Sequence, residues 1–575
     1  NSGNQLLENN GKSIHKGLPA DFDWWRYKVL PRSDDAVAIW ADYRHSNLGA
    51  QIYFQFINPD GSVDFTPNGK PITLSPAEYS NEFDAIVTPD DQIAIVWLDH
   101  NMIKAQLLDS SGMPLWGNDG MDVAIDPVIY KNSPKISYEN GAFYIGWSQV
   151  HQAINNYHLL RITGQKLVNG IRQWGDNGIA LSEDIQNEMF DSCLSQIVGR
   201  YFVWNKSYFS GDLTGSSVKM VKLVNPDGTA ATGWSEAGLP ASDIMGEYYT
   251  PNEAKAVATS AGLCLVWRDS RDNWIPNLYG QMISPQGIKL WNPNGIRFSD
   301  INNNVNEYDV LVRNDNLYLI WSEDVLSTNF NTTDIKLKRI NLSGQSQSGE
   351  QGIVLSAGGQ YIQNTNPVLQ IFPNGGMLAA WEHKYYNTVL FISADNLIKH
   401  RYLNPDGSVD NTQINEVWTT VDSDTQNYPK TAIVGNDAYL FWVDADFYHN
   451  SDRCGPDYLD TRDLYVMKLS NEITSVDDEV VPLAGFTLKQ NYPNPFRSET
   501  NIRFSLKQNA AVDLSVYNLK GQKITTLKHG LLDKGSHNLL WNGTDTNKTS
   551  VASGVYFIKL HSGNTTLTRK MVLMR

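Results

Sequence analysis

The stretch FDAIVTPDDQIAIVWLDHNMIKAQLLDSSGMPLWGNDGMDVAI, residues 83–125, contains four short apolar segments separated by turn sequences. The first two segments, FDAIV and IAIVW, flank PDDQ, in which proline and aspartate favour a tight turn. The third segment, IKAQLLD, leads through a glycine-containing turn to the fourth, DGMDVAI. Short apolar runs of this kind, bounded by turn residues, predict β-strands. The stretch therefore predicts four antiparallel strands joined by short connections.

The same order of segments recurs along the chain, and its marker is an apolar strand that ends in tryptophan. Successive marker tryptophans lie 50 to 63 residues apart. Periods of roughly 40–50 residues with several short strands each are typical of β-propellers. The marker strands are AVAIW (36–40), IAIVW (93–97), FYIGW (143–147), YFVW (201–204), LCLVW (263–267), LYLIW (317–321), MLAAW (377–381) and AYLFW (438–442). They predict an all-β, eight-bladed β-propeller in which each tryptophan packs between neighbouring sheets.

The eighth unit contains three predicted strands, and we expect its fourth strand to come from the other end of the chain. Earlier units end in a glycine-led fourth strand, as in NGKPI (68–72). Near the start of the chain, NGKSI (10–14) matches that segment closely. We therefore predict that residues 10–16 pair with residues 463–470 and close the ring, which removes an open sheet edge. Residues 1–7 are expected to be a tail.

A carboxylate or another polar residue stands two positions after each marker tryptophan. The acids are Asp42, Asp99, Asp269, Glu323 and Asp444, and Gln149, Lys206 and His383 take their place in the other units. We interpret the acids as caps of the loops that follow. The units resemble the W-x-D…Q…G…W…G repeats of many exported Bacteroidota proteins, and the resemblance covers residues 1–475. It implies a propeller and assigns no activity.

The end of the chain differs from the repeats in charge. Residues 483–575 contain 13 Lys and Arg against 4 Asp and Glu, a net charge of +9, whereas residues 1–482 carry −25. The acidic linker 476–484 separates the two parts. In residues 485–575, predicted strands of five to seven residues alternate with KG, DKG, NG and SG turns, which favours a small Ig-like β-sandwich.

Several motifs follow one another in this last segment. They are NYPNPF (491–496), TNIRFSL (500–506), VYNLKGQKI (516–524), GSHNLLWNG (535–543), SGVYFIKL (553–560) and KMVLMR (570–575). In this order they resemble the type A C-terminal sorting domain of the Bacteroidota type IX secretion system, although Arg497 and Ser498 replace the usual Asn and Pro after NPF. Within this resemblance, Gly554, Tyr556 and Lys570 fall in motifs that the family retains.

The resemblance implies a route of export. It implies docking to the outer-membrane machinery of type IX secretion after passage through the periplasm. The protein is then expected in the medium or on the outer cell surface, with its signal peptide already removed.

Other features exclude several classes of function. The acidic body disfavours binding to nucleic acid, which needs Lys and Arg to neutralise phosphates. The sequence contains no run of about 18 apolar residues that would span a membrane, and its three cysteines are too few for a disulfide framework. It contains no H-E-x-x-H, G-x-S-x-G or phosphate-loop motif. Asp84 and Asp309 begin two inner strands and are interpreted as turn caps. A catalytic site assembled across blades stays open, because geometry rather than chain order defines such a site.

The loops that follow the marker strands differ most between units, and we call the face on which they are expected the long-loop face. Aromatic side chains among Asn and Asp suit the recognition of sugars or peptides. The candidates are Tyr208, Phe209, Trp274, Phe330, Tyr385, Tyr386, Phe447 and Tyr448. The last loop is dense in carboxylates, and Asp444, Asp446, Asp452 and Asp457 are candidate ligands of a structural Ca²⁺. No other cofactor is expected.

The sequence thus predicts a secreted or cell-surface, non-enzymatic propeller that binds a glycan or a protein through its long-loop face. Two alternatives stay open. One is an extracellular polysaccharide-active enzyme, a hydrolase or a lyase. The other is a self-assembling surface protein whose closing strand passes to a neighbouring molecule by strand addition.

Overall fold

The computed structural model divides the chain into two compact units, Asn1–Glu472 and Ile473–Arg575, which we call the N-terminal and the C-terminal unit. All elements of the described residues are β-strands, so no helix among them is long and apolar enough to cross a membrane. The structure describes residues 12–15, 22–42, 50–65, 68–73, 82–126, 129–154, 157–187, 194–209, 215–243, 246–247, 254–272, 274–325, 332–359, 362–387, 392–405, 408, 415–417, 425–446, 461–469, 486–488, 491, 496–506, 509–518, 520, 522–562 and 565–574. The predicted linker lies outside these residues.

The N-terminal unit consists of groups of antiparallel strands that repeat along the chain. The first strands of the groups are β2 (Phe22–Pro31), β6 (Phe83–Val87), β10 (Lys131–Glu139), β16 (Leu194–Val198), β21 (Lys255–Thr259), β25 (Asn304–Arg313), β29 (Ile362–Ile371) and β33 (Thr425–Val434). The second strands, which carry the marker tryptophans, are β3 (Ala36–Asp42), β7 (Ile93–Asp99), β11 (Ala142–Ile154), β17 (Tyr201–Phe209), β22 (Gly262–Asp269), β26 (Asn316–Asp324), β30 (Met377–Asn387) and β34 (Asp437–Asp446).

The outer half of each group is formed by a long third strand and a short fourth strand. The third strands are β4 (Gln51–Ile57), β8 (Met102–Leu108), β12 (Tyr157–Val168), β18 (Gly215–Leu223), β23 (Asn277–Ile283), β27 (Thr333–Asn341), β31 (Ile392–Leu403) and β35 (Thr461–Leu469). The fourth strands are β5 (Lys70–Pro71), β9 (Met121–Asp122), β14 (Ile179–Ala180), β19 (Leu239–Pro240), β24 (Ile296–Arg297), β28 (Ile353–Ser356), β32 (Asn415–Val417) and β1 (Lys12–His15). β13 (Ile171–Arg172), β15 (Ile185–Asn187) and β20 (Gly246–Glu247) add short pairings to β12 and β18.

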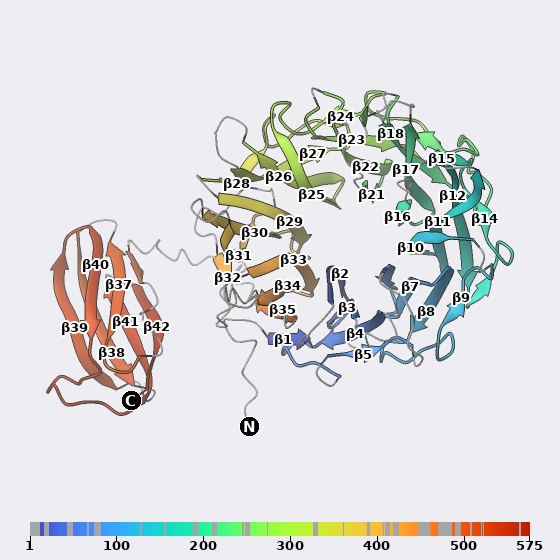
Figure 1. Ribbon diagram of the computed structural model, residues 1–575. Helices are drawn as coiled ribbons and strands as arrows, with labels where there is room; N and C mark the ends of the chain where they lie inside the picture. Colours follow the sequence, from blue (N-terminus) through green and yellow to red (C-terminus); the bar gives the residue numbers. More distant parts are fainter. Residues whose placement is uncertain are drawn as a thin grey trace. The chain divides into compact units, whose positions relative to one another are not determined.

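The first strands contact one another in a closed circuit. In chain order the circuit runs through β2, β6, β10, β16, β21, β25, β29 and β33, and β33 returns to β2. Figure 1 shows the strand groups arranged as a ring around these strands. The last two groups form one continuous sheet, joined by a parallel pairing between Asn396 of β31 and Thr425 of β33. The N-terminal unit is therefore all-β and propeller-like.

The N-terminal strand β1 pairs with β35 and so joins the two ends of the unit within one sheet. The antiparallel register aligns Lys12 with Val466 and His15 with Leu464. Ile14 is buried in the core between this sheet and the first group. The pairing predicted for the N-terminal segment is confirmed for the described residues 12–15, and it lies within the chain.

Side-chain contacts show that β1 behaves like the fourth strand of an ordinary group. Lys12 Nζ donates to the Gly61 carbonyl at 3.2 Å, in the turn of the following group. Lys70 occupies the same place in its own group, and its Nζ donates to the Gly112 carbonyl at 3.1 Å. The resemblance between NGKSI and NGKPI therefore reflects an equivalent contact.

A buried pair of side chains fastens the closing strand to the first group. His15 Nε2 lies 2.9 Å from Asp42 Oδ2, and both side chains are about 4% exposed. Asp42 stands two residues after the marker Trp40, and its carboxylate also faces the indole N–H of that tryptophan at 3.4 Å. Buried polar groups are costly unless they are paired, so this arrangement specifies the position of β1.

The marker tryptophans form the core, and the residue two positions later accepts the indole hydrogen bond in several groups. Residues two apart on a strand lie on the same face, which explains the spacing. These pairs are Trp40–Asp42 (3.4 Å), Trp147–Gln149 (2.9 Å), Trp267–Asp269 (3.2 Å) and Trp321–Glu323 (2.7 Å). The interpretation of the acids as loop caps holds at Asp269, which also accepts the backbone N–H of Arg271 at 2.9 Å. The partner that these groups share is the indole.

Glycine opens the fourth strands because the marker tryptophan and a carbonyl of the third strand leave no room for a side chain. At Gly178 the backbone has φ of +74°, and an added Cβ would lie 2.3 Å from the Gly164 carbonyl oxygen and 3.1 Å from Trp147. The same close approach relates Gly69 to Trp40, Gly120 to Trp97, Gly238 to Trp204, Gly295 to Trp267 and Gly352 to Trp321. The repeated glycine therefore follows from backbone conformation and packing together.

Polar side chains on the first strands link neighbouring groups to one another. Asp84 on β6 forms an ion pair with Lys28 on β2, and its other oxygen accepts the backbone N–H of Ile136 on β10 at 3.0 Å. Asp309 on β25 pairs with Lys255 on β21 at 2.8 Å. The interpretation of Asp84 and Asp309 as turn caps is therefore wrong, because both carboxylates bridge successive groups around the circuit.

Because two histidines are buried in the fold, we expect the protein to lose stability in mild acid. Burial lowers the pKa of His383 and His400 to about 4, below the value of about 6.5 for an exposed imidazole. Between these values the unfolded chain binds more protons than the folded chain, so the free energy of unfolding falls as the pH drops from about 6.5 to about 4. Thermal unfolding across this range checks the expectation.

The variant His400→Phe isolates one of the two contributions. Its unfolding temperature is expected to depend less on pH between about 4 and 6.5 than that of the wild-type protein, because an ionisable group with a lowered pKa has been removed. Parallel curves for the two proteins would contradict the assignment.

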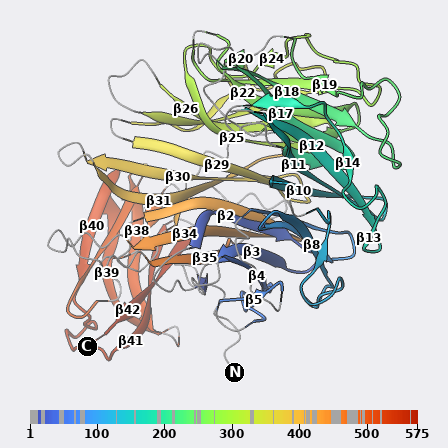
Figure 2. The ribbon, with the colours of Figure 1, turned by 45° about the vertical axis from the view of Figure 1, so that its right-hand side comes forward.

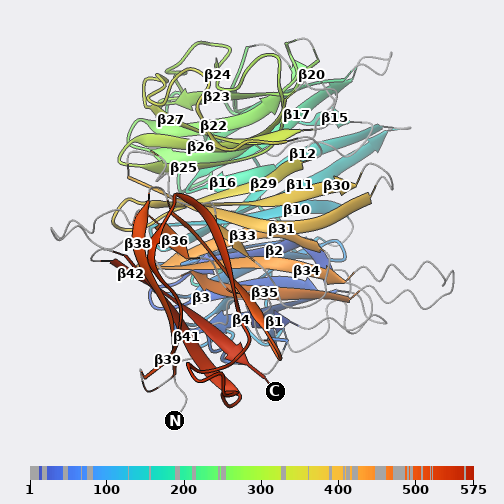
Figure 3. The same ribbon diagram turned by 90° about the vertical axis from the view of Figure 1, so that its left-hand side faces the viewer.

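The C-terminal unit is a sandwich of two sheets. One sheet contains β36 (Phe486–Leu488), β37 (Thr500–Leu506) and β40 (Gly535–Trp541), and the other has the order β39 (Lys523–Leu532), β38 (Ala510–Asn518), β41 (Gly554–Ser562) and β42 (Thr565–Leu573). A single core cluster contains buried side chains from both sheets. Figures 2 and 3 show the strands of this unit from two directions. Its classification as Ig-like stays a prediction.

Candidate functional site

The loop between β22 and β23 is a part of the long-loop face that the structure describes almost completely. It follows the marker Trp267 and contains Arg271, Asp272 and Trp274. Trp274 is 63% exposed, although most tryptophans of the unit are buried. Exposing an indole to water is unfavourable by about 2 kcal/mol relative to burying it. The loop therefore presents a large apolar surface to solvent.

Backbone conformation makes the position of Trp274 unusual. The N–H of Ile275 donates to the carbonyl of Asp272 at 3.2 Å, which closes a four-residue turn. Trp274 is the third residue of this turn and has φ of +62°. The third position of a turn with positive φ normally carries glycine or asparagine, and a bulky residue there is strained by about 1–2 kcal/mol. Such strain is characteristic of sites with a function.

The first half of the loop is anchored by Arg271 and Asp269. The two side chains form an ion pair, and both are less than 10% exposed. Arg271 Nε donates to Asp269 Oδ2 at 2.8 Å, and its Nη1 donates to the Ser242 hydroxyl at 3.0 Å and the Asn294 carbonyl at 2.8 Å. Arg271 thereby ties the loop to two neighbouring segments.

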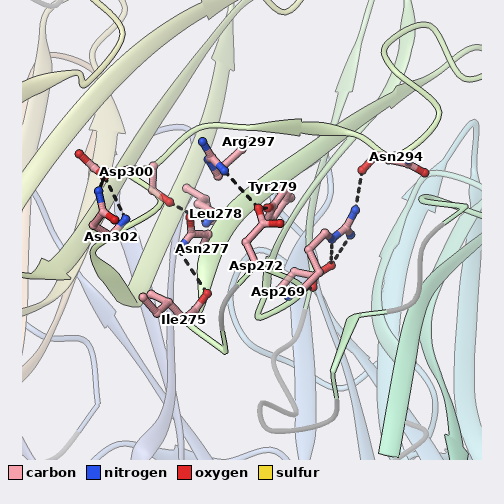
Figure 4. Close-up of polar contacts among 12 residues, drawn as sticks. Asp269, Asp272, Ile275, Asn277, Leu278, Tyr279, Asn294, Arg297, Asp300 and Asn302 are labelled. Atoms are coloured by element: carbon pink, nitrogen blue, oxygen red, sulfur yellow. Dashed lines mark hydrogen bonds and ion pairs between the residues drawn. The ribbon is translucent and has the colours of Figure 1, made fainter.

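The second half of the loop is anchored by Asp272, as Figure 4 shows. Its carboxylate accepts hydrogen bonds from the hydroxyl of Tyr279 and from Arg297 Nη1, the latter at 3.1 Å. Burial, together with the neighbouring carboxylate, raises the pKa of Tyr279, so its hydroxyl stays a donor at neutral pH. The guanidinium of Arg271 lies 4.4 Å from the centre of the Tyr279 ring. The turn that carries Trp274 is therefore held from both sides.

The remaining candidate aromatics are described less completely. Tyr208 and Phe209 lie at the end of β17, and Tyr385 and Tyr386 lie near the end of β30, but their side chains are outside the described set. Phe330, Phe447 and Tyr448 lie outside the described residues. These seven residues stay predictions.

The calcium candidates are likewise covered only in part. Asp444 is buried on β34, and the backbone of Asp446 ends that strand. Asp452 and Asp457 lie outside the described residues. Within the described part of the chain, no cluster of three or more His, Cys, Asp or Glu side chains is arranged to hold a metal ion. The calcium site stays a prediction.

Sequence reasoning missed the residues that hold the Trp274 turn. Arg271, Asp272, Tyr279 and Arg297 come from the loop and from two strands, and each one looks ordinary in its own segment. One signal was present: Arg271 follows Asp269 by two positions, the same spacing that links Asp269 to Trp267. This spacing suggests that Arg271, like Trp267, donates a hydrogen bond to the Asp269 carboxylate.

In the C-terminal unit the sorting-type motifs meet in space. The backbone N–H of Phe496, from the NPF segment, donates to the Val572 carbonyl at 2.9 Å, and the N–H of Met574 donates to the Phe496 carbonyl at 2.8 Å. The first motif of the segment thus pairs in parallel with the last strand.

Aromatic packing brings two further motifs into the same cluster. The ring of Trp541 lies 5.5 Å from that of Phe496 and 5.3 Å from that of Tyr556. Tyr556 is buried, and its hydroxyl donates to the Ala552 carbonyl at 2.7 Å. Gly554 begins β41 in an extended conformation, and the backbone of Lys570 pairs with Phe557. Four of the motifs therefore serve one core.

Solved structures with partial likeness to the chain include hydrolases. A puromycin-hydrolyzing peptidase of Mycobacterium tuberculosis is 11% identical with a TM-score of 0.38, and the match covers 87% of this chain and 61% of that one. An endo-arabinase of Bacteroides thetaiotaomicron is 10% identical with a TM-score of 0.27, covering 47% and 91%. A protein of unknown function from Dyadobacter fermentans is 9% identical with a TM-score of 0.31, covering 80% and 99%. The chain spans about three fifths of the peptidases it matches.

The sequence comparison that gives a match covers part of the C-terminal unit. No curated protein sequence matches the chain. One family model, the secretion system C-terminal sorting domain, matches residues 490–574. This match covers the motifs that meet around Phe496, Trp541 and Tyr556. Residues 490–574 therefore match a C-terminal sorting domain of the type IX secretion system, and this match implies export to the cell surface or the medium.

Proposed function

We propose that the protein is an exported, eight-bladed propeller that binds a glycan on its long-loop face, with Trp274 as the stacking surface. The observation that carries the proposal is the exposed indole at a strained, positive-φ position of a turn that is anchored from both sides. Flat aromatic surfaces with a few oriented polar groups suit sugar rings. Asp272 and Arg297 are both about one-third exposed and supply such groups nearby. The closed circuit of first strands supports the blade number.

Replacement of Trp274 tests the binding role. The variant Trp274→Ala is expected to weaken glycan binding by about tenfold or more, because a stacking contact of this size contributes on the order of 1–2 kcal/mol. Trp274→Phe, which keeps an aromatic ring, is expected to bind with intermediate affinity. Binding of the full-length protein to a glycan array, followed by titration calorimetry with the best ligand, measures the effect.

The variant Trp274→Gly separates binding from folding. Glycine adopts positive φ without strain, so this variant is expected to unfold at the same or a higher temperature than the wild-type protein and still lose glycan binding. Tyr130→Ala, which removes another aromatic side chain that is about half exposed, serves as the control and keeps binding intact. Equal affinity for Trp274→Gly and the wild-type protein would contradict the proposal.

Further measurements on the same protein distinguish the alternative functions. Release of shortened sugars during incubation would favour a polysaccharide-active enzyme, and binding only to protein ligands would favour a protein-recognition module. Concentration-dependent growth of the particle would favour self-assembly through the closing strand, which sedimentation velocity detects.

A further inference from the structure

We propose that the outward face of the four-stranded sheet in the sorting domain is the surface that docks to the secretion machinery, and that its partner is an acidic protein surface. The inference rests on the type IX assignment of residues 490–574 and names the face that is recognised. We call it the aromatic–lysine face, and its described members are Tyr517, Lys523, Val555, Phe557, Lys559 and Val572.

The strand register assigns these residues to one side of the sheet. Alternate residues of β38 and β41, such as Val516 and Ile558, enter the sandwich core, so their neighbours face outward. On the outward side, Tyr517 of β38 stands directly opposite Phe557 of β41. Val555 stands opposite Val572 of β42. The centre of the face is therefore aromatic and aliphatic, and its side chains are half-buried.

Two lysines flank this apolar centre at the Tyr517 ring. Lys559 Nζ lies 4.9 Å from the centre of the Tyr517 ring, and Lys523 Nζ lies 6.0 Å from it. A cation beside an aromatic face is attracted by the negative charge of the ring's π-electrons. Both ammonium groups therefore lie beside the Tyr517 ring.

Carboxylates are scarce on this face. Asp513 also lies on the outward side, where it accepts a hydrogen bond from the Ser515 hydroxyl and lies 3.2 Å from His529 and 3.8 Å from Lys523. Across residues 483–575, 13 cationic side chains stand against 4 carboxylates. An apolar centre with cations around it complements a protein surface that has an apolar patch ringed by Asp and Glu.

Export of charge-reversed full-length protein tests the proposal. In a host with type IX secretion, the double variant Lys523→Glu/Lys559→Glu is expected to lower the fraction of protein on the surface or in the medium by about tenfold, because like charges now face the acidic partner. The protein should accumulate folded inside the cell envelope. The matched control, Lys534→Glu/Lys548→Glu, makes the same change of net charge in two turns and is expected to be exported normally.

The outcomes separate this inference from the assignment on which it rests. Normal export of the face variant, or an equal loss in both double variants, would overturn the docking face and leave the export signal in place. Retention of the wild-type protein would instead refute export by this route. If the glutamate variant fails to fold, as limited proteolysis would show, Lys523→Gln/Lys559→Gln decides by the same readout, with a smaller loss expected.

Discussion

Replacing Gly178 with alanine is expected to lower the free energy of unfolding by about 2–4 kcal/mol, through two effects that act together. Alanine at φ of +74° is strained by about 1 kcal/mol. Its Cβ would also lie 2.3 Å from the Gly164 carbonyl oxygen and 3.1 Å from Trp147, so the fourth strand or the marker tryptophan must move. Crowding of a packed core adds about 1–3 kcal/mol. Chemical denaturation followed by tryptophan fluorescence measures the change.

The same strand group provides a matched control. Gly175 has φ of +75°, but an added Cβ there meets no atom within 4 Å. Gly175→Ala therefore carries only the conformational strain and is expected to cost about 1 kcal/mol. The difference between the two variants isolates the crowding of the added Cβ by the Gly164 carbonyl and Trp147. Equal losses would show that backbone conformation alone explains the glycine of the repeat.

Replacing His15 with alanine is expected to destabilise the closed ring by about 3–5 kcal/mol. The imidazole is the buried partner of the Asp42 carboxylate, and removing one member of a buried pair leaves a charge in a poorly solvated position. The loss falls on the one sheet that contains both ends of the N-terminal unit. Denaturation midpoints give the size of the effect, and hydrogen exchange of the β35 amides shows whether β1 has separated.

Ser13→Ala is the control for this prediction because it changes the same strand. The Ser13 hydroxyl donates to the carbonyl of His15 at 2.9 Å from a half-buried position, so its loss is expected to cost less than about 1 kcal/mol. Protection of the β35 amides should survive in this variant and fall in His15→Ala. The same protection in both variants would show that the contact between His15 and Asp42 does not hold the closing strand.

The repeat and its closure could be predicted because each depends on short-range patterns. Alternating apolar segments, turn residues and the N-G element are visible within one unit, and the match of NGKSI to NGKPI carries the same glycine and lysine. The bridging role of Asp84 could not be predicted, because it depends on which strands become neighbours around the ring. The lysine that pairs with Asp84 lies on β2, in a different strand group, so the sequence of one unit does not identify it.

The candidate site shows a similar limit. The sequence marks eight loop aromatics as equivalent, and the 63% exposure of Trp274 becomes apparent only once the turn conformation is known. Its positive φ follows from a turn closed by Asp272 and Ile275, and from anchors that come from outside the loop. In the sorting domain, the order of the motifs is visible, whereas the pairing of Phe496 with the last strand arises from the tertiary fold.

The pairing of β1 with β35 has a mechanical consequence. The C-terminal unit follows β35 along the chain, and in the antiparallel ladder Lys12 lies opposite Val466, near the end of β35 from which the chain leaves. Opposed loads on the two chain ends therefore act on the same end of this ladder and separate its pairs one after another. A tether at the C-terminal end alone places no such load on β1. The ring is thus suited to anchoring by one end and opens most easily when both ends are held.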